Sequence, residues 1–265
     1  MTEPSASRST TAPDPRDRFL LTDKVCLVTG GSRGLGLQMV RAFAAAGADV
    51  VIASRKLANC EAVAEEIERT TGRAAMPIGC HVGDWQQVDA MVEAVFERFG
   101  RIDVLVNNAG MSPLYGSLAE HSEALYDKVF DVNLKGPFRL MANIGTRMAA
   151  GAGGSIINVS SGGAVRPGPT IIPYAAAKAG LNAMTVGFAH AFGPSVRVNC
   201  IQAGPFLTDI SDAWDVPAVE ARMKTTFAMQ RCGRPDEVVG AALYFASDAS
   251  SWTTGAILPV DGGMP

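Results

Sequence analysis

"VCLVTGGSRGLGLQMVRAFAAAG", residues 25–47, places a short β-branched run, a glycine-rich turn and an apolar helical segment in direct succession. Gly30, Gly34 and Gly36 let the backbone turn tightly and come close to a ligand, because glycine has no Cβ. The N-terminus of the following helix offers unpaired N–H groups and a positive dipole end to a pyrophosphate. The succession therefore predicts a dinucleotide site. The alternative is a tight turn without a ligand, since the spacing is Gly-x-x-x-Gly-x-Gly rather than Gly-x-Gly-x-x-Gly.

The alternation of strand-like and helical segments continues to the end of the chain. Short runs rich in β-branched residues recur, among them DVVIAS, IDVLVN, SIINVS and VRVNCI. Helical segments are expected between them, at about 35–47, 57–71, 85–99, 122–150, 173–192 and 235–247. Strands that alternate with helices of this length imply right-handed crossovers. We therefore predict an α/β fold with one doubly wound, mostly parallel sheet and helices on both faces.

The composition favours a soluble protein whose partner is a small molecule. The 265 residues include 23 Lys and Arg against 26 Asp and Glu, and the basic residues are dispersed. This pattern lacks the basic patch of a nucleic-acid binder. No apolar run approaches the ~20 residues of a membrane helix. The five cysteines form no Cys-x-x-Cys pair, which indicates neither a disulfide framework nor a zinc site and favours a reducing, cytoplasmic compartment.

The chain is expected to form one domain behind a short tail. Residues 1–20 have no apolar signal-peptide core and carry acidic residues, so we expect a disordered N-terminal tail. Residues 21–265 would then form a single domain. The one long connection, at about 203–233, is interpreted as a lid over the site rather than as a domain boundary.

The end of the second expected strand, VVIASRK, predicts which dinucleotide binds. An NAD site places an acidic residue there for the ribose 2′-hydroxyl. This chain has Ser54, Arg55 and Lys56 instead, and Arg33 lies inside the glycine loop. A guanidinium binds a 2′-phosphate through two hydrogen bonds, so the sequence predicts NADP(H) in preference to NAD(H). The alternative is that Arg55 and Lys56 are ordinary solvated residues at a strand end.

A lysine lies on the apolar face of the helical segment PYAAAKAGLNAMTVGFAHAF, residues 173–192. Tyr174, Lys178 and Leu181 fall within an arc of about 80°. A buried ammonium costs desolvation unless another group pairs with it or uses it. Tyr174 is one turn away, and a neighbouring cation favours the phenolate. We therefore expect Lys178, together with the positive charge of an oxidised nicotinamide, to lower the pKa of Tyr174 below its ordinary value of about 10.

Several motifs in order resemble those of the short-chain dehydrogenase/reductase family, over residues 22–263. They are TGGSRGLG (29–36), NNAG (107–110), VNLKG with Asn133, NVSSGG with Ser161, YAAAK (174–178), GRPDEV and PVDGG. The resemblance implies a Rossmann-type fold with seven strands in the order 3-2-1-4-5-6-7. It also implies a catalytic set of Asn133, Ser161, Tyr174 and Lys178, with Ser161 preferred to Ser160 because the family serine lies thirteen positions before the tyrosine.

The expected nucleotide contacts combine the glycine loop, the end of the second strand and the matching family positions. They are Gly30, Ser32, Arg33, Gly34, Leu35, Gly36, Ser54, Arg55, Lys56, Val82, Asn108, Ala109, Gly110, Tyr174, Lys178, Gly204 and Thr208. Two positions depart from the family pattern. His81 stands where an aspartate usually reaches the adenine, and Gly204 follows Ala203 where the family usually reads Pro-Gly.

The resemblance implies an oxidoreductase that interconverts a ketone or aldehyde and an alcohol. Tyr174 would give a proton to the carbonyl oxygen, Ser161 would stabilise the developing charge, and Asn133 would hold a relay water. The other hypotheses are a nucleotide-sensing protein without catalysis, and a dehydratase or epimerase on the same scaffold. The resemblance also implies a homotetramer or a homodimer.

Ten residues on the surrounding loops suggest an apolar substrate pocket, although core packing or a subunit contact would explain each equally well. They are Met111, Leu114, Tyr115, Ile171, Ile172, Phe206, Leu207, Trp214, Met223 and Phe227. The segment MAAGAGGS, before the expected fifth strand, carries no Lys or Arg, which disfavours an acidic carrier protein as substrate. His81, His121 and His190 have no metal-site spacing and are interpreted as ordinary residues.

Overall fold

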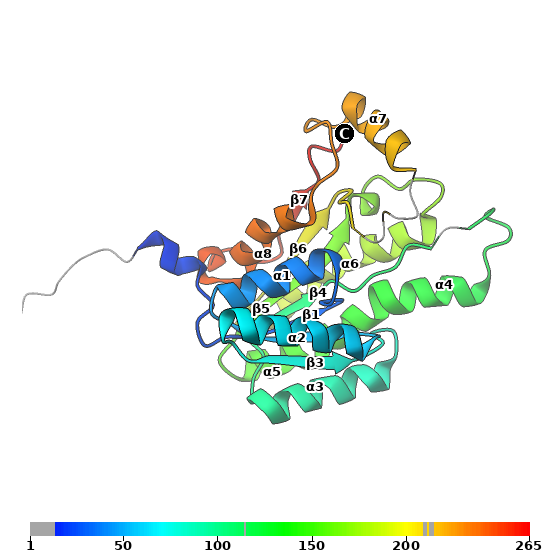
Figure 1. Ribbon diagram of the computed structural model, residues 1–265. Coiled ribbons are helices and arrows are strands. Elements are labelled where there is room, and N and C mark those ends of the chain that lie inside the picture. The colour runs from blue at the N-terminus through cyan, green and yellow to red at the C-terminus, as the bar shows by residue number, and fades with distance from the viewer. Residues whose placement is uncertain (1–13, 114, 209–210, 212–214) are drawn as a thin grey trace, which may run out of the picture.

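Seven parallel strands form one sheet in the order β3-β2-β1-β4-β5-β6-β7 (Figure 1). The computed structural model describes residues 14–113, 115–208, 211 and 215–265. The strands are β1 (Val25–Thr29), β2 (Asp49–Ser54), β3 (Ala75–Gly79), β4 (Val104–Asn107), β5 (Gly154–Ser161), β6 (Val196–Ala203) and β7 (Ile257–Val260). The predicted α/β fold and its strand order are confirmed.

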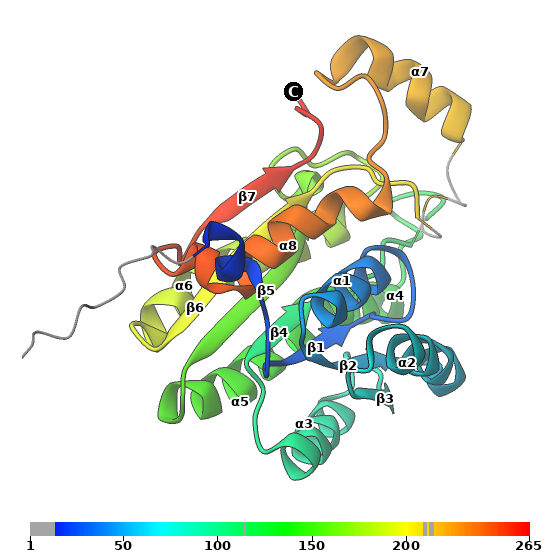
Figure 2. The same ribbon diagram turned by 60° about the vertical axis from the view of Figure 1, so that its left-hand side comes forward.

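Helices cover both faces of the sheet (Figure 2). Val50 and Ile52 of β2 belong to the core that packs under α1 (Gly34–Ala45), α2 (Leu57–Thr71) and α8 (Val239–Ala246). Val51 belongs to the opposite core, because successive side chains of a strand point to opposite faces. That second core lies under α3 (Trp85–Phe99), α5 (Gly136–Ala150) and α6 (Ile172–Phe192). Burial on both faces explains why the strands read as continuous apolar runs.

The helical region expected over residues 122–150 changes its helix type along its length. Glu123–Phe130 form α4, Asp131–Lys135 form one π-helical turn, and α5 follows without a break. Pro137 has no N–H to continue the α-helical hydrogen bonds, and Gly136 instead donates to the carbonyl of Asp131. Such π turns are frequent at functional sites, and this one contains Asn133.

The first described residues include a short helix. Residues 1–13 of the expected tail lie outside the described residues, and Pro15–Phe19 form a 3-10 helix. The carboxylate of Asp14 caps that helix by accepting from the backbone N–H of Arg16 at 2.9 Å. No helix in the described part of the chain is long and apolar enough to cross a membrane.

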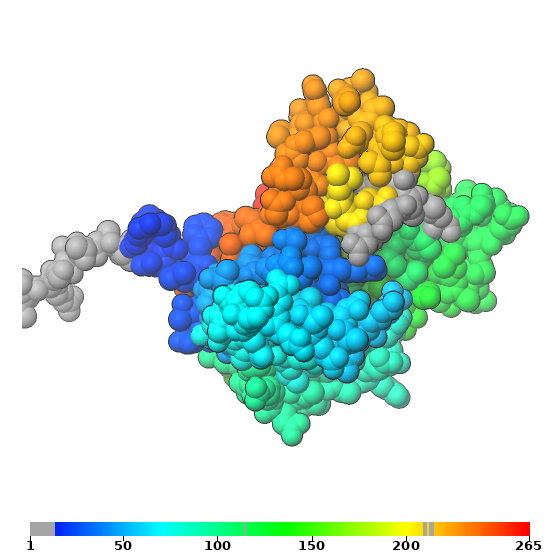
Figure 3. Space-filling model, in the orientation of Figure 1, coloured from blue at the N-terminus to red at the C-terminus, as the bar shows by residue number. Residues whose placement is uncertain are grey.

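The connection at about 203–233 contains α7 (Val216–Thr226), while residues 209–210 and 212–214 lie outside the described residues. In the space-filling view α7 projects from the body of the molecule (Figure 3). The expected helix at 235–247 is a 3-10 turn, Pro235–Val238, followed by α8.

Candidate active site

The carboxyl ends of β1 and β4 lie side by side where the strand order reverses. Open parallel sheets bind ligands outside this point. The glycine loop leads from β1 into α1, with Gly30 at φ +65° and Gly34 at φ +54°. A Cβ on Gly36 would lie 2.3 Å from the carbonyl oxygen of Gly30. The loop therefore forms a close-packed cradle of backbone N–H groups at a helix N-terminus, which fits a pyrophosphate.

Thr29 and Asn108 fasten this loop to the end of β4. The Thr29 hydroxyl accepts from the backbone N–H groups of Asn108 and Ala109 at 3.0 and 3.1 Å, and it donates to the Val106 carbonyl. The Asn108 side-chain amide donates to the carbonyls of Thr29 and Gly30 at 2.9 and 3.3 Å. These bonds fix the glycine loop and the NNAG turn as one unit.

The expected nucleotide residues at the end of β2 meet the start of the glycine loop. The hydroxyls of Ser32 and Ser54 are 3.0 Å apart, although 22 positions separate them in sequence. Arg33, Arg55 and Lys56 are all exposed around this contact. Three basic residues are thus chain neighbours of two serines whose hydroxyls are in contact.

The remaining nucleotide positions lie along the same edge. Leu35 packs against the core under α1. An added Cβ on Gly34 would lie 3.5 Å from the Thr208 side chain, so Thr208 faces the glycine loop. Val82 is buried, and its carbonyl would be 2.1 Å from a Cβ on Gly136.

Both departures from the family pattern have a local structural account. The backbone N–H of His81 donates to the Gln87 side chain at 2.9 Å, and the His81 ring lies beside Gly83. A Cβ on Gly204 would come within 2.5 Å of the Asp261 Cα, so close packing between the ends of β6 and β7 requires glycine there.

Lys178 is buried, with 3% of its surface exposed, as its place on the apolar face predicts. Its ammonium donates to the carbonyl of Val159 at 2.8 Å and lies 5.8 Å from the centre of the Tyr174 ring. Burial lowers the pKa of Lys178 to about 8. The ammonium is therefore held at the end of β5, one turn below the tyrosine.

The direction expected for Tyr174 is wrong for the protein side chains by themselves. Burial raises the pKa of the Tyr174 phenol, and hydrogen bonding with Ser161 opposes the rise. Lys178 does not reverse this shift, because desolvation of the phenolate outweighs a cation that lies beside the ring and binds Val159.

Ser160 and Ser161 point to different partners. The Ser160 hydroxyl is buried and donates to the backbone carbonyl of Lys178 at 3.2 Å. The Ser161 hydroxyl accepts from the N–H of Gly163 at 3.1 Å and interacts with the Tyr174 phenol. The structure thus brings Ser161, and not Ser160, to the tyrosine.

Asn133 is fully buried in the π-helical turn. Its amide donates to the carbonyls of Met111 and Val129, and its oxygen accepts from the N–H of Met111. A Cβ on Gly110 would lie 3.0 Å from the Asn133 oxygen and 3.5 Å from the Lys178 ammonium. Gly110 therefore lets the chain pass close to both groups.

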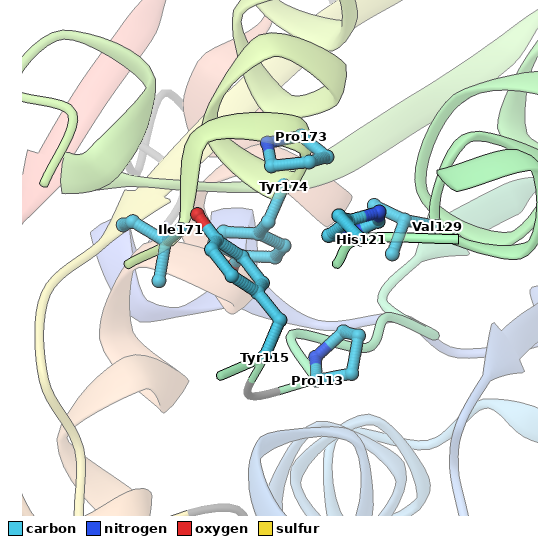
Figure 4. A pocket seen from close by; sticks show the side chains of 7 residues that line it. All are labelled: Pro113, Tyr115, His121, Val129, Ile171, Pro173 and Tyr174. Carbon is cyan, nitrogen blue, oxygen red and sulfur yellow. The ribbon is translucent and has the colours of Figure 1, made fainter. Parts of the chain in front are cut away.

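A small pocket adjoins Tyr174 (Figure 4). Besides the tyrosine, Pro113, Tyr115, His121, Val129 and Ile171 line it. The Tyr115 hydroxyl donates to the Pro169 carbonyl at 2.8 Å and accepts from the N–H of Ile172 at 3.2 Å. The loop after β4 is thereby tied to the first turn of α6, which carries Tyr174.

The ten expected pocket residues separate into groups. Tyr115 and Ile171 line the pocket, and Met111 binds Asn133 through its backbone. Phe206 is buried in the core under α8. Met223 and Phe227 form a small cluster with Cys232, against which Leu207 packs, so core packing holds for these residues. Ile172 is exposed, and Leu114 and Trp214 lie outside the described residues.

Sequence reasoning missed Thr29 and His121. A threonine at the end of an otherwise apolar strand is a buried polar group in need of partners, which was the available signal for Thr29. No local signal marks His121, because its place beside Tyr174 depends on the fold of the loop. In the described part of the chain no three His, Cys, Asp or Glu residues cluster closely enough to hold a metal.

Comparison with known proteins gives consistent matches. The family model described as enoyl-(acyl carrier protein) reductase matches residues 30–265. Dehydrogenase/reductase SDR family member 4 of Bos taurus is 36% identical over 92% of this chain and 88% of its own. The 3-oxoacyl-[acyl-carrier-protein] reductase FabG of Thermotoga maritima is 36% identical over 92% and 98%. The NADPH-dependent 3-quinuclidinone reductase of Rhodotorula rubra superposes with a TM-score of 0.89, at 30% identity over 98% of both chains.

The chain belongs to the short-chain dehydrogenase/reductase family. Members of this family are oxidoreductases that bind NAD(H) or NADP(H) and act on alcohol or carbonyl groups. The earlier resemblance to that family is confirmed.

Proposed function

We propose that the protein is an NADP(H)-dependent oxidoreductase that interconverts a ketone or aldehyde and an alcohol, with Asn133, Ser161, Tyr174 and Lys178 as its catalytic set. The observation that supports it most is the convergence of these four residues from three elements. Ser161 interacts with the Tyr174 phenol, and Asn133 and Lys178 approach the same backbone point at Gly110.

The bound nicotinamide supplies or accepts the hydride. In the reducing direction Tyr174 donates its phenolic proton to the carbonyl oxygen, and the Ser161 hydroxyl stabilises the developing negative charge. The raised pKa of Tyr174 keeps the phenol protonated and able to donate at neutral pH. With a pKa of about 8, Lys178 is mostly an ammonium at pH 7, which favours the phenolate left behind.

Asn133 supports the proton path and the geometry. Its amide has two carbonyl acceptors, and its oxygen already accepts from Met111. In this proposal the remaining lone pair of the oxygen holds the water that returns a proton to Lys178.

The proposed preference for NADP(H) rests on Arg33, Arg55 and Lys56 around the contact between Ser32 and Ser54. Cations and hydroxyls suit a 2′-phosphate, which an acidic residue at the end of β2 would repel. The ratio of the Kd values for NADPH and NADH tests this preference. Tighter binding of NADH would contradict it.

The proposed substrate is a small, mainly apolar carbonyl or alcohol compound, because prolines and aliphatic side chains supply most of the pocket wall. FabG of Thermotoga maritima and the matched family model are named for acyl-carrier-protein substrates. An acidic carrier would need basic residues near the entrance. Residues 111–121 contain no Lys or Arg.

The proposed assembly is a homotetramer or a homodimer of a cytoplasmic protein. Ile257 and Leu258 of β7, at the sheet edge, are partly exposed, and Trp252 is 99% exposed. A second copy would bury this apolar edge. Light scattering that finds a stable monomer would contradict the proposal.

Steady-state turnover tests the function as a whole. NADPH oxidation is followed with a panel of ketones and aldehydes graded by size and polarity. We expect turnover of several members, and its absence across the panel and across the corresponding alcohols would overturn the proposal.

A further inference from the structure

His121 lines the pocket beside Tyr174, and two contacts hold its ring in place (Figure 4). Its Nδ1 lies 3.2 Å from the carbonyl oxygen of Ser122. The Tyr115 ring packs against it edge to face, with 4.9 Å between ring centres. Tyr115 is itself fixed to the start of α6 by its two hydroxyl hydrogen bonds. The imidazole is therefore oriented relative to the helix that carries Tyr174.

The second ring nitrogen of His121 is buried and has no hydrogen-bond partner among the described residues. Leaving a buried polar atom unpaired costs stability, because the atom has lost its hydrogen bonds to water. The other polar side-chain atoms of the pocket wall are already used: the Tyr115 hydroxyl binds Pro169 and Ile172, and the Tyr174 phenol interacts with Ser161. Among the side-chain polar atoms of the described wall, His121 Nε2 is thus the one that is buried without a hydrogen-bond partner.

The contact between His121 Nδ1 and the Ser122 carbonyl determines whether Nε2 donates or accepts a hydrogen bond. A carbonyl oxygen only accepts hydrogen bonds, so Nδ1 of His121 must carry the hydrogen that it shares with Ser122. In the neutral imidazole the other nitrogen then has a lone pair and no hydrogen. Nε2 therefore accepts a hydrogen bond, and its natural partner is a donor such as a hydroxyl group.

We infer that His121 Nε2 accepts a hydrogen bond from a hydroxyl group of the substrate, so that the protein selects hydroxylated carbonyl compounds over their apolar analogues. This inference rests on the proposed function, in which Tyr174 serves the reacting oxygen. His121 then holds a second oxygen within an otherwise apolar wall. One polar group in an apolar pocket is an effective determinant of orientation and specificity.

The test uses pairs of ketones and NADPH with the full-length protein. Each pair consists of a hydroxy ketone and the analogue with a methyl group in place of the hydroxyl. The hydroxyl stands one, two or three carbons from the carbonyl. We expect kcat/KM to favour the hydroxylated member by about tenfold at one spacing, the effect of one neutral hydrogen bond. His121→Phe should bring that ratio close to one, whatever its effect on the turnover of the methyl analogue.

Two variants control the comparison. His121→Gln keeps an acceptor oxygen and should restore part of the preference, which a purely structural role would not predict. His190→Phe changes an exposed histidine of the same helix that carries Tyr174 and should leave the ratio unchanged. The Kd for NADPH, measured for each variant, reports whether the nucleotide side is intact.

The outcomes separate this inference from the proposed function. A wild-type protein that turns over ketones without a hydroxyl preference at any spacing overturns the inference alone, as does His121→Phe with an unchanged ratio. A stronger preference for a carboxylate than for a hydroxyl also overturns it, because a carboxylate needs a donor. No turnover of any carbonyl compound or alcohol overturns the proposed function and this inference together.

Discussion

The nucleotide side and the substrate side of the site are held by different forces. On the nucleotide side the glycine loop packs backbone against backbone, and hydrogen bonds of Thr29 and Asn108 tie it to the end of β4. In the connection at 203–233, which is proposed to cover the substrate side, Met223 is the one buried residue among those of α7, and a cluster with Phe227 and Cys232 anchors the helix. Two backbone hydrogen bonds, from Ala228 and Met229 to the chain end, add to it.

This difference indicates how one scaffold serves different chemistry. A side whose contacts are backbone contacts tolerates little change, whereas a side that rests on a few apolar side chains can be altered locally. Of the proposed catalytic residues, Ser161, Tyr174 and Lys178 lie between the two, on the end of β5 and the first turns of α6. Substitutions should therefore separate into those that remove chemistry, those that remove nucleotide binding and those that change substrate affinity.

The largest effect on activity is expected from a substitution of Tyr174, which lies between the nucleotide side and the substrate side. Tyr174→Phe removes the proton donor but keeps the ring, so kcat should fall by about 10³-fold. The Kd for NADPH should change by less than about twofold, because the ring still fills its place. Stopped-flow turnover and fluorescence titration check these values. Turnover near that of the wild type would contradict the acid/base role.

The second largest effect is expected on the nucleotide side, where Gly36→Ala should weaken NADPH binding. The added Cβ would lie 2.3 Å from the Gly30 carbonyl oxygen and 2.5 Å from the Asn108 amide, so the cradle must open. We expect the Kd for NADPH to rise by about 100-fold. Gly187→Ala is the matched control, because a Cβ there meets nothing within 4 Å. Equal affinities in the two variants would show that the cradle is not close-packed.

A smaller and more selective loss is expected at the end of β2. Arg55→Ala combined with Lys56→Ala should weaken NADPH binding by about tenfold, because two partly solvated charges are lost. NADH binding should stay the same, since it carries no 2′-phosphate. Arg69→Ala, an exposed arginine at the end of α2, is the control. A parallel loss of NADH affinity would contradict recognition of the 2′-phosphate.

On the substrate side Met223→Ala should loosen α7 without affecting the nucleotide. Met223 is 3% exposed and contacts Cys232 at 3.3 Å, so truncation leaves a cavity in a small cluster. We expect KM for apolar ketones to rise several-fold, about three to ten times, and the Kd for NADPH to stay constant. Limited proteolysis should cut 203–233 faster. Arg222→Ala, an exposed neighbour, should change none of these.

The smallest effect is a pH dependence of stability. Because burial lowers the pKa of Lys178 to about 8, the folded protein releases this proton at a lower pH than the unfolded chain does. Lys178 therefore contributes a free energy of unfolding that rises between pH 8 and the ordinary lysine pKa of 10.5. Buried thiols such as Cys200, whose pKa rises to about 11, contribute in the opposite direction.

A comparison of wild type with Lys178→Met isolates the lysine from those thiols. Urea unfolding at a series of pH values should show that the difference in free energy between the two proteins changes with pH over this window. A constant difference would mean that the Lys178 pKa is not lowered by burial.

The sequence located the nucleotide loop and the catalytic helix because both depend on local geometry. Glycine spacing sets where a backbone can turn and approach a phosphate, and a spacing of four places Tyr174 and Lys178 on one helix face. It did not predict the π-helical turn that buries Asn133. That turn depends on Pro137 and on contacts with the distant residues Met111 and Gly110.

By itself, then, the sequence determined the alternation of strands and helices, the glycine turn and the placing of Tyr174 and Lys178 on one helix face, because short-range periodicity and steric limits fix them. The strand order followed from the resemblance to the family. Only the tertiary structure decided that the Lys178 ammonium binds the Val159 carbonyl, that burial raises the Tyr174 pKa, and that His121 faces the pocket. These features depend on desolvation and on contacts between segments far apart in the chain, which no local pattern records.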